Sequence, residues 1–279
     1  MIHDSRLPQT PPSSTYAKEL ATVHKALRLA SDRIHQLVSE GLIIQTKPDG
    51  SPVTNADLEV DRVLREHLLE AFPEDGWLSE ERPDHPSRLK KTRVWILDPI
   101  DGTKPFTSSL PQFTISLALI DRGQLALGMI LNPATREYFS AIQGGGASLN
   151  GRRLHSLSPK ILTSPIEGRP TFLVSRGSLP RNLLKEWKAS AQCPPILGSI
   201  AYSLAMVASG RVDGVINLGF QHEWDIAAGA LIVQEAGGLV LDKHQRPLSL
   251  NQPHPMVEGI IAVTPHAFPL IERFLRSMP

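Results

Sequence analysis

The sequence predicts an α/β fold in which helices and sheets alternate in layers, and three observations predict it. Two long stretches near the start carry apolar residues at helical spacing. Two apolar runs joined by a short polar turn follow them, which is a hairpin signal. After about residue 150, short apolar runs alternate with helical stretches. Alternation of this kind favours an α/β layer structure.

The chain divides into a tail and two halves. Residues 1–14 are polar and rich in proline, so we expect a loose N-terminal tail and not a secretory signal. We expect an N-terminal α+β half over residues 15–150 and a C-terminal α/β half over residues 151–279, with no long linker between them. The 279 residues are enough for one large domain or two of ordinary size.

Composition argues against several functional classes. A hydrophobic fraction of 41% and a charged fraction of 20% are typical of a soluble globular protein. A net charge of +1 gives no reason to expect binding to nucleic-acid polymers or membranes, and no apolar run approaches the roughly 20 residues that cross a bilayer. The single cysteine, Cys193, forms no internal disulfide, so we expect a cytoplasmic protein. The oligomeric state is open, with a homodimer as one option.

The first two predicted helices are amphipathic. Residues 16–38 place apolar side chains three and four positions apart, and Gly41 fits the end of this helix. A loop over residues 47–52 leads to a second helix, which opens near Val53 and ends before Pro73. Both stripes predict core packing.

Two acidic positions beside these elements have two interpretations each. Asp57 lies in the first turn of the second helix, where it can close a capping box with Thr54 or, as a functional group, accept a proton or hold a water. Glu80 and Glu81 follow a short predicted strand at Gly76–Leu78. Adjacent glutamates are usually a solvated surface, and the alternative is a metal ligand.

The stretch Asp98–Thr103 is the strongest functional signal. It follows the apolar run Val94–Leu97, which predicts a buried strand. Gly102 permits a tight turn, and the N–H groups of Gly102 and Thr103 would face a phosphate if a helix starts there. An Asp next to a Gly after a strand can also be a simple turn former. Two carboxylates beside an anion-binding turn are what a divalent cation with a phosphoryl group requires.

Spacing argues against three other motifs. Asp98 and Asp101 do not fit the Asp-x-Asp-x-Asp-Gly order of an EF-hand. Two residues separate them, unlike the Asp-x-Asp-Gly-Thr pattern of phosphatases with an aspartyl nucleophile. Gly144–Gly146 lacks the Gly-x-Gly-x-x-Gly spacing of a dinucleotide site, so we expect a mobile turn there.

The rest of the chain supplies sheets and covering helices. We expect strands over residues 113–120, 125–131, 137–142, 171–175, 195–197, 213–217, 239–241 and 260–263, and helices over residues 179–189, 199–209, 225–235 and 266–275. Ser199 fits the N-cap of one of these helices and Gly210 fits its end. Asp225 can cap the next helix or act as a third carboxylate ligand. Ala227–Gly229 are small enough to let that helix approach neighbouring backbone.

Four blocks of the sequence together resemble the inositol monophosphatase superfamily of magnesium-dependent phosphatases. They occur in the family's order: Ser51–Asp57, Leu78–Glu81, Trp95–Thr103, and Trp224–Gly229 followed by Glu235–Gly238. Each block is a modest signal alone, whereas the ordered set is specific. The resemblance implies a layered α-β-α-β-α sugar-phosphatase fold with the metal site between the two halves.

The resemblance also implies roles for the matching positions. The Mg²⁺ ligands would be Glu80, Asp98, the carbonyl of Ile100, Asp101 and Asp225, with Asp98 bridging two of the two or three ions. The catalytic residues would be Asp57 and Thr103, which orient the attacking water, and Glu80. The residues that bind the phosphorylated substrate would be Gly102, Thr103, Ser199 and Asp225.

The resemblance implies a small phosphorylated metabolite as the substrate. Lys104 and Phe106 resemble the 3′(2′),5′-bisphosphate nucleotidase branch, so we expect adenosine 3′,5′-bisphosphate, with inositol 1-phosphate or a related sugar phosphate as the alternative. Gly198–Ser199 is not followed by the lysine usual in the nucleotidase branch, and residues 217–220 lack the glutamate of the inositol branch. The alternative of a different class is a non-catalytic phosphometabolite sensor. Inhibition by Li⁺ is expected from the resemblance alone.

Overall fold

The structure is a computed structural model, and it describes residues 14–154, 169–175, 185, 187–188, 191–196 and 198–276. The helices are η1 (Ser14–Tyr16), α1 (Ala17–Glu40), α2 (Asn55–Ala71), η2 (Pro86–Lys90), α3 (Thr103–Thr107), α5 (Ile200–Ala208), α6 (Glu223–Glu235) and α7 (Phe268–Arg276). The strands are β1 (Ile44–Thr46), β2 (Pro52–Thr54), β3 (Gly76–Ser79), β4 (Arg93–Asp101), β5 (Thr114–Asp121), β6 (Gln124–Asn132), β7 (Glu137–Ile142), β8 (Gly146–Leu149), β9 (Arg152–Arg153), β10 (Phe172–Val174), β11 (Gly214–His222), β12 (Leu239–Leu241) and β13 (Met256–Val263).

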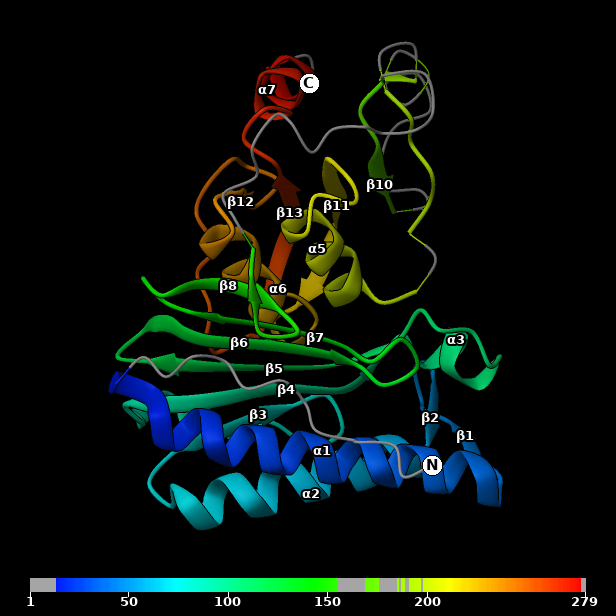
Figure 1. The fold of residues 1–279 in the computed structure, drawn as a ribbon, viewed down its shortest axis with the longest axis vertical. Coiled ribbons are helices and arrows are strands. Elements are labelled where there is room, and N and C mark those ends of the chain that lie inside the picture. Colours follow the sequence, from blue (N-terminus) through cyan, green and yellow to red (C-terminus); the bar gives the residue numbers. More distant parts are fainter. Residues whose placement is uncertain are drawn as a thin grey trace.

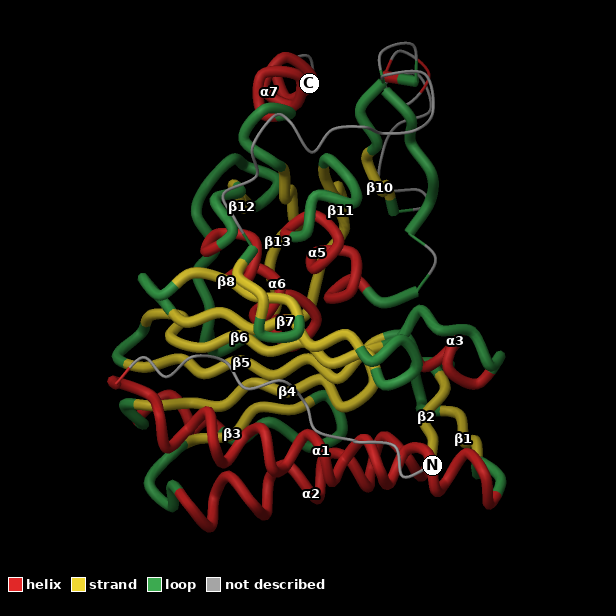
Figure 2. The backbone as a smooth tube through the Cα atoms, viewed as in Figure 1, coloured by secondary structure: helices red, strands yellow, loops and turns green. Residues whose placement is uncertain are grey.

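These elements stack in five layers. Helices α1 and α2 cover one face of a seven-stranded sheet, and α5 and α6 lie between that sheet and a four-stranded sheet (Figure 1). Helix α7 packs on the outer face of the second sheet, where Ile271 joins Ile261 and Val263 in an apolar cluster. Figure 2 shows the same order of helix and strand layers. The expected α-β-α-β-α layering is therefore confirmed.

The seven-stranded sheet has the order β3-β4-β5-β6-β7-β8-β9 and is antiparallel except for the β3–β4 pair. Both of its faces are buried, and its side chains alternate between two cores. In β4, Trp95 and Leu97 face α1 and α2, whereas Val94 and Ile96 face α5 and α6. This explains why β4 is a continuous apolar run rather than an alternating one.

The four-stranded sheet has the order β10-β11-β13-β12. Strand β10 is parallel to β11, and the other neighbours are antiparallel. The register of β11 against β13 shifts between Asn217 and Phe220, and Gly259 in the facing strand has φ +76°. A Cβ on Gly259 would lie 2.9 Å from the carbonyl oxygen of Asn217, so this irregularity requires a glycine.

The two N-terminal helices form where the sequence predicts them. The buried side chains of α1 follow one stripe, and Gly41 at its C-terminus has φ +101°. Helix α2 begins with the predicted capping box, in which Thr54 and Asp57 exchange hydrogen bonds. Small residues bring α6 close to its neighbours, since a Cβ on Gly128 would lie 2.7 Å from the carbonyl oxygen of Ala228.

Several predicted boundaries were wrong. Strand β4 continues through Asp101 because Asp98 and Asp101 still pair with β5, with an irregularity between them. The predicted loop over residues 47–52 is the turn of the β1–β2 hairpin, whose strands have three residues each. Strands β8 and β9 were not expected, and the strand predicted over residues 213–217 begins one residue later and continues to His222 as β11.

The remaining predictions have mixed outcomes. Helix α6 begins at Glu223, two residues before its predicted start, and Pro195 makes only an isolated bridge to Val174. The turn at Gly144–Gly146 is anchored, because the N–H groups of Gly144 and Gly146 donate to the Glu235 carboxylate at 2.8 Å. Most of the predicted helix over residues 179–189 and the tail before residue 14 lie outside the described residues.

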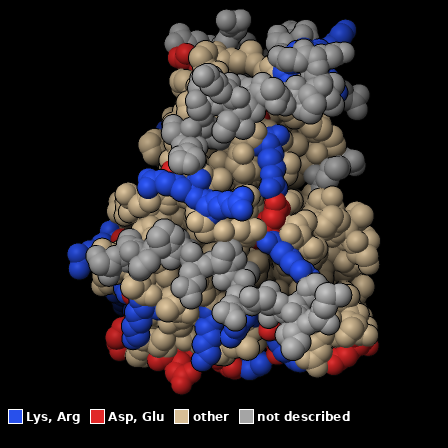
Figure 3. Space-filling view, in the orientation of Figure 1, with Lys and Arg blue, Asp and Glu red and all other residues tan. Residues whose placement is uncertain are grey.

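The surface has interspersed charges over the helical layer formed by α1 and α2 (Figure 3). A row of basic side chains crosses the middle of the same face at the level of β8 and β9, where Arg152 and Arg153 are exposed. Within the described residues, no helix has the length and apolar content needed to span a membrane.

Candidate active site

The end of β4 places the first two candidate carboxylates in the buried interior. Asp98 is 1% exposed and Asp101 8% exposed. The Ile100 N–H donates to Asp98 Oδ1 at 3.0 Å, which fixes the Asp98 side chain against its own strand. Gly102 follows with φ +94°, and a Cβ there would lie 2.6 Å from the carbonyl oxygen of Gln112. The turn after β4 therefore depends on a glycine, and α3 starts directly after it.

Asp101 is held by the start of α5. Its Oδ2 accepts hydrogen bonds from Ser199 Oγ at 2.6 Å and from the Ala201 N–H at 2.7 Å. The Ser199 hydroxyl also accepts from the Tyr202 N–H and lies 3.0 Å from Thr114 Oγ1. Ser199 is thus the predicted N-cap, and it orients a candidate metal ligand as well. Its role as a substrate-binding residue stays a prediction.

Asp57 connects the capping box of α2 to the turn after β4. Its Oδ2 accepts from the Thr54 N–H at 2.8 Å and from Thr54 Oγ1 at 2.6 Å. Its Oδ1 lies 3.3 Å from Thr103 Oγ1, which also lies 3.1 Å from the carbonyl oxygen of Ile100. Asp57 is fully buried, and its capping interpretation is confirmed, whereas its role toward a water stays a prediction.

Glu80 and Glu81 are not a solvated surface. The Glu80 N–H donates to the carbonyl oxygen of Leu97 at 3.2 Å, which ties this segment to β4. Lys47, in the turn of the β1–β2 hairpin, donates to Glu80 Oε1 at 2.7 Å and to Glu81 Oε1 at 2.6 Å. Burial raises the pKa of Glu81 to about 7, although the Lys47 ammonium opposes this.

Helix α6 delivers the last carboxylate from the C-terminal half. Asp225 lies in its first turn and accepts from the His222 N–H at 3.3 Å, as a capping residue does. The same side chain is hydrogen bonded to that of Asp98. The rings of His222 and Trp224 stack with centroids 4.4 Å apart, and burial lowers the pKa of His222. The capping and ligand interpretations of Asp225 are therefore compatible.

Electrostatics show that these acids gather in one place. We call Asp57, Glu80, Asp98, Asp101 and Asp225 the carboxylate cluster. Burial raises the pKa of Asp98 well above its ordinary value, and the charges of the other four acids of the cluster raise it further. Burial also raises the pKa of Asp225 well above its ordinary value, with Asp101 and Glu80 adding to it. Burial raises the pKa of Asp101 to about 6, although the bonds from Ser199 and Ala201 oppose this.

The donor set fits a hard divalent cation. The carboxylate cluster offers only oxygen atoms, and its negative charges repel one another in a buried place. As the side chains stand, no three His, Cys, Asp or Glu residues of the described chain are arranged to hold one ion. Side chains of the carboxylate cluster would have to rearrange for three of them to hold one ion. Binding of cations would remove the repulsion that raises these pKa values.

Three residues around the cluster were missed by sequence reasoning. Lys47 neutralises part of the Glu80–Glu81 charge, and nothing in its local sequence signals this. Asp61 is 2% exposed and accepts from Ser79 Oγ at 2.6 Å. Asp61 follows Asp57 by four residues, so both acids lie on the apolar face of α2. From its position on this face, Asp61 could have been predicted from the sequence to be buried. Thr114, opposite Ser199, had no such signal.

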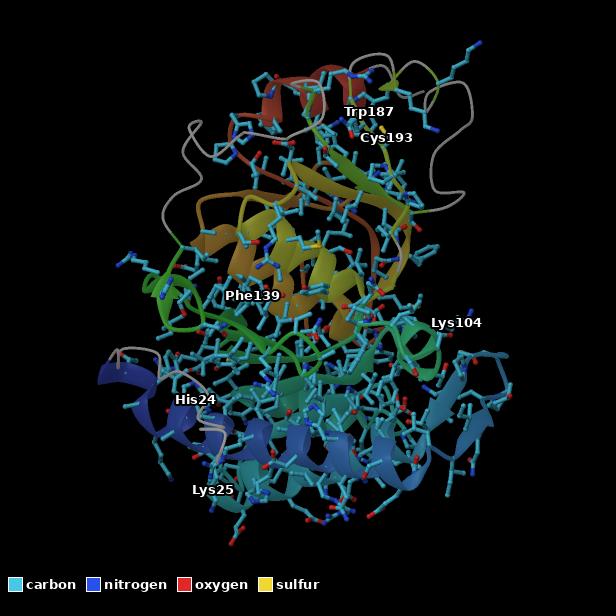
Figure 4. The ribbon with its side chains drawn as sticks, turned by 45° about the vertical axis from the view of Figure 1, so that its right-hand side comes forward. His24, Lys25, Lys104, Phe139, Trp187 and Cys193 are labelled. Carbon is cyan, nitrogen blue, oxygen red and sulfur yellow. The ribbon has the colours of Figure 1, made fainter. Side chains whose placement is uncertain are left out.

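Lys104, which suggested the nucleotidase branch, is exposed on α3. Figure 4 shows its side chain at the outer side of that helix, pointing away from the body of the protein. No described residue forms a hydrogen bond or ion pair with its ammonium group that would fix it. Phe106 is buried instead and packs on Phe113 with ring centroids 4.7 Å apart. These two residues therefore have different surroundings, although they are close in sequence.

The fold and the site together define a layered α/β protein with a buried cluster of carboxylates, a donor set that suits a divalent cation. A model of the inositol monophosphatase family matches residues 16–272. The inositol-1-monophosphatase of Rhizobium meliloti is 37% identical over 208 residues, which cover 73% of this chain and 76% of that protein. The Nus factor SuhB of Salmonella typhimurium is 34% identical, over 68% of this chain and 71% of its own length. The chain belongs to the inositol monophosphatase family.

Solved structures agree with this assignment. The IMPase of Thermotoga maritima has a TM-score of 0.79 and 28% identity, with 93% of this chain and 97% of that chain covered. An IMPase/NADP phosphatase complexed with Mg²⁺ and phosphate has a TM-score of 0.82 at 20% identity, which supports the fold alone. Members of this family are magnesium-dependent phosphatases, so the expected enzyme class, a magnesium-dependent phosphoric monoester hydrolase, and the expected cofactor, Mg²⁺, are confirmed.

The comparisons favour the alternative substrate over the first. The relatives named above are an inositol-1-monophosphatase and a SuhB protein, and a Bacillus subtilis inositol-1-monophosphatase is 30% identical over 84% of this chain. The expected nucleotidase branch has no support among them.

Proposed function

We propose that this chain releases phosphate from inositol 1-phosphate or a related polyol phosphate, with water as the nucleophile. The observation that carries the proposal is the convergence of acids from separate elements on Asp98. Asp57 comes from α2, Glu80 follows β3, and Asp225 starts α6, and all three raise the Asp98 pKa. A stable protein needs no such accumulation of buried negative charge, whereas a magnesium site does.

The proposed metal ligands are Glu80, Asp98, the Ile100 carbonyl, Asp101 and Asp225, for two or three ions with Asp98 shared. When bound, Mg²⁺ supplies Lewis-acid chemistry, which lowers the pKa of a water and stabilises charge on the transferred phosphoryl group. The chain itself orients the ligands. The Ile100 N–H fixes Asp98, and Ser199 and Ala201 fix Asp101.

Asp57 and Thr103 are the proposed water-orienting pair. The Thr103 hydroxyl lies within 3.3 Å of Asp57 Oδ1, so a water that donates to Thr103 Oγ1 would let the hydroxyl pass its own proton to Asp57. Burial raises the pKa of Asp57, although its bonds from Thr54 oppose this. A carboxylate with a raised pKa is a better proton acceptor near neutral pH than an exposed one.

The turn after β4 is the proposed phosphate-binding element. Gly102 has the left-handed backbone and α3 begins directly after it, so the N–H groups of Gly102 and Thr103 are the first free donors there. Ser199 and Asp225 are proposed to contact the substrate from the C-terminal half. This places substrate contacts on both sides of the carboxylate cluster.

Adenosine 3′,5′-bisphosphate is the second candidate substrate. The exposed ammonium group of Lys104, one residue after Thr103, is the observation that favours it, because a second phosphate needs a further positive charge. The names of the relatives favour an inositol phosphate. We therefore place inositol 1-phosphate first.

The test is phosphate release from inositol 1-phosphate, adenosine 3′,5′-bisphosphate and fructose 1,6-bisphosphate, each with Mg²⁺ and with EDTA. We expect turnover that requires Mg²⁺ and is fastest with inositol 1-phosphate. Faster turnover of the bisphosphate nucleotide would select the second candidate. Binding of these compounds without any phosphate release would instead identify a phosphometabolite sensor.

Three further properties belong to this proposal. We expect inhibition by Li⁺, a cytoplasmic location and a homodimer. Titration of the phosphatase assay with LiCl tests the first, cell fractionation the second, and analytical ultracentrifugation the third.

A further inference from the structure

A second cavity lies beside β3, outside the carboxylate cluster. Its volume is about 520 Å³, which is within the range of small-molecule sites. We call it the β3 cavity and define it by Arg65, Trp77, Arg82, Asp84, Arg88 and Lys91, with the rest of β3 along it. No residue of the carboxylate cluster lines it.

The cavity follows the free edge of a sheet. Strand β3 is the outermost strand of the seven-stranded sheet, and within the described part of the chain it pairs with β4 alone (Figure 1). All four residues of Gly76–Ser79 line the cavity in succession, although their side chains point alternately to opposite faces. The cavity therefore runs along the outer side of this strand, where only Trp77 of its four residues is partly exposed.

The acids that line the β3 cavity are already neutralised. The Asp84 carboxylate accepts hydrogen bonds from Nε and Nη2 of Arg88, at 2.6 and 2.9 Å. Asp75 accepts hydrogen bonds from Arg93 Nη2 at 3.1 Å and from Trp95 Nε1 at 2.8 Å. Neither carboxylate is left to repel an anion.

Two cations in the same cavity keep their charge. Arg65 on α2 is partly buried and has no hydrogen-bond or ion-pair partner among the described residues. The carboxylate nearest to Lys91 Nζ is Glu74 Oε2 at 3.7 Å, on a side chain that is 95% exposed. An ion pair this exposed contributes little, so Lys91 remains available. Of the charged groups around the cavity, the uncompensated ones are therefore positive.

Part of the cavity lining is apolar and includes an aromatic ring. Trp77 presents a partly buried indole, and Leu69 and Pro83 complete this side. An inorganic anion would use the charges and leave this wall uncovered. A ligand that also carries a planar ring would cover the wall as well.

We propose that the β3 cavity binds an anion of the nucleoside monophosphate class. The phosphate pairs with Arg65 and Lys91, and the base packs against Trp77 along the edge of β3. This site is separate from the proposed phosphatase activity, and its test does not depend on that activity.

The cavity also has a structural connection to Glu80. Asp61 accepts from Trp77 Nε1 at 3.4 Å and from Ser79 Oγ at 2.6 Å, and it pairs with Arg82 Nε. Trp77 and Arg82 line the cavity, and Ser79 directly precedes Glu80. A ligand that contacts Trp77 or Arg82 therefore acts on the residues that fix the Glu80 segment.

The test is calorimetric titration of the full chain with guanosine 5′-monophosphate in EDTA at low ionic strength. EDTA removes the metal that the carboxylate cluster would need to hold a phosphate. We expect saturable binding that Arg65→Gln weakens about tenfold and that a double change with Lys91→Gln abolishes. Inorganic phosphate should bind more weakly than the nucleotide because it leaves Trp77 uncovered.

Arg62→Gln is the matched control, since Arg62 lies on the same helix, pairs with Glu59 and Glu66, and does not line the cavity. It should bind the nucleotide as the wild type does. Arg65→Lys keeps the charge and should retain most of the affinity, which separates loss of the ligand contact from misfolding. Equal affinity in the wild type and the double variant, or no binding by the wild type, would overturn the proposal.

Discussion

The carboxylate cluster and the β3 cavity both involve the Gly76–Glu81 segment, and their charges are arranged in opposite ways. In the cluster, buried acids face one another and their pKa values rise. Beside the β3 cavity, buried or half-buried charges are paired, as Arg88 is with Asp84. The free charges there belong to Arg65 and Lys91, which are only partly buried.

The difference indicates which region gains stability from a bound cation. Unpaired buried charges destabilise a fold unless something neutralises them. The carboxylate cluster therefore requires cations to reach its lowest free energy. The β3 cavity is stable without a ligand, because water solvates its free cations. The following experiments test this contrast, from the largest expected effect to the smallest.

Asp98→Asn should lower phosphate release by about a thousandfold or more, because the amide removes the charge shared between the proposed metal positions. Steady-state rates with Mg²⁺ measure this. Glu70→Gln, which changes an exposed acid on α2, is the control and should leave the rate unchanged. A rate within tenfold of the wild type would refute the proposed role of Asp98.

Asp101→Asn should remove part of the pH dependence of stability in EDTA. The Asp101 pKa is raised from 3.8 to about 6, so between these values the folded chain holds a proton that the unfolded chain has lost. The free energy of unfolding of the wild type should therefore fall as pH rises through this window. A pKa difference of about 2 corresponds to about 3 kcal/mol.

Urea unfolding at several pH values measures this effect. The Asn variant should show a shallower decline, and Mg²⁺ should restore the stability of the wild type at neutral pH. The same slope in both proteins would mean that Asp101 does not titrate in this range.

Asp57→Asn should lower kcat about a hundredfold and change KM little, because Asp57 is proposed to accept a proton and not to bind substrate. A comparison of Thr103→Ser with Thr103→Val completes the test. The serine variant keeps the hydroxyl and should retain most of the activity, whereas the valine variant should resemble Asp57→Asn. Equal rates for the two Thr103 variants would argue against the water-orienting pair.

Asp61→Asn should lower the free energy of unfolding by about 2 kcal/mol, because Arg82 loses its buried partner and Ser79 a charged acceptor. Glu59→Gln changes an acid on the same helix whose side chain is 18% exposed, against 2% for Asp61, and should change the free energy of unfolding by about 0.5 kcal/mol or less. Urea unfolding measures both. If Asp61→Asn also weakens Mg²⁺ binding, the two regions are coupled through Ser79.

The sequence allowed the helices and the chemistry of the site to be predicted better than the short strands. The stripe of α1 and the Thr54–Asp57 capping box are local patterns, so they can be read directly. Strands β1 and β2 have three residues each and flank a stretch rich in turn residues, and only their pairing makes them strands. Strand β11 continues past Asn217 because β13 pairs with it, which local sequence does not show.

The carboxylates could be predicted because they lie in ordered motifs, whereas their supports could not. Ser199 reads as a helix cap, and only the packing of α5 against the end of β4 gives it contact with Asp101. Lys47 lies in an unremarkable turn, and its contact with Glu80 exists only after the β1–β2 hairpin has folded. Long-range neighbours of this kind leave no local signal.

Helix α6 has a consequence for synthesis on the ribosome. It carries Asp225 and also covers the sheet face formed by Val94, Ile96, Ala118 and their neighbours. A nascent chain that has emerged only as far as β9 therefore lacks the helix that covers this apolar sheet face. It also lacks Asp225, one of the proposed metal ligands. Docking of α6 would cover this surface and complete the set of proposed metal ligands in the same step.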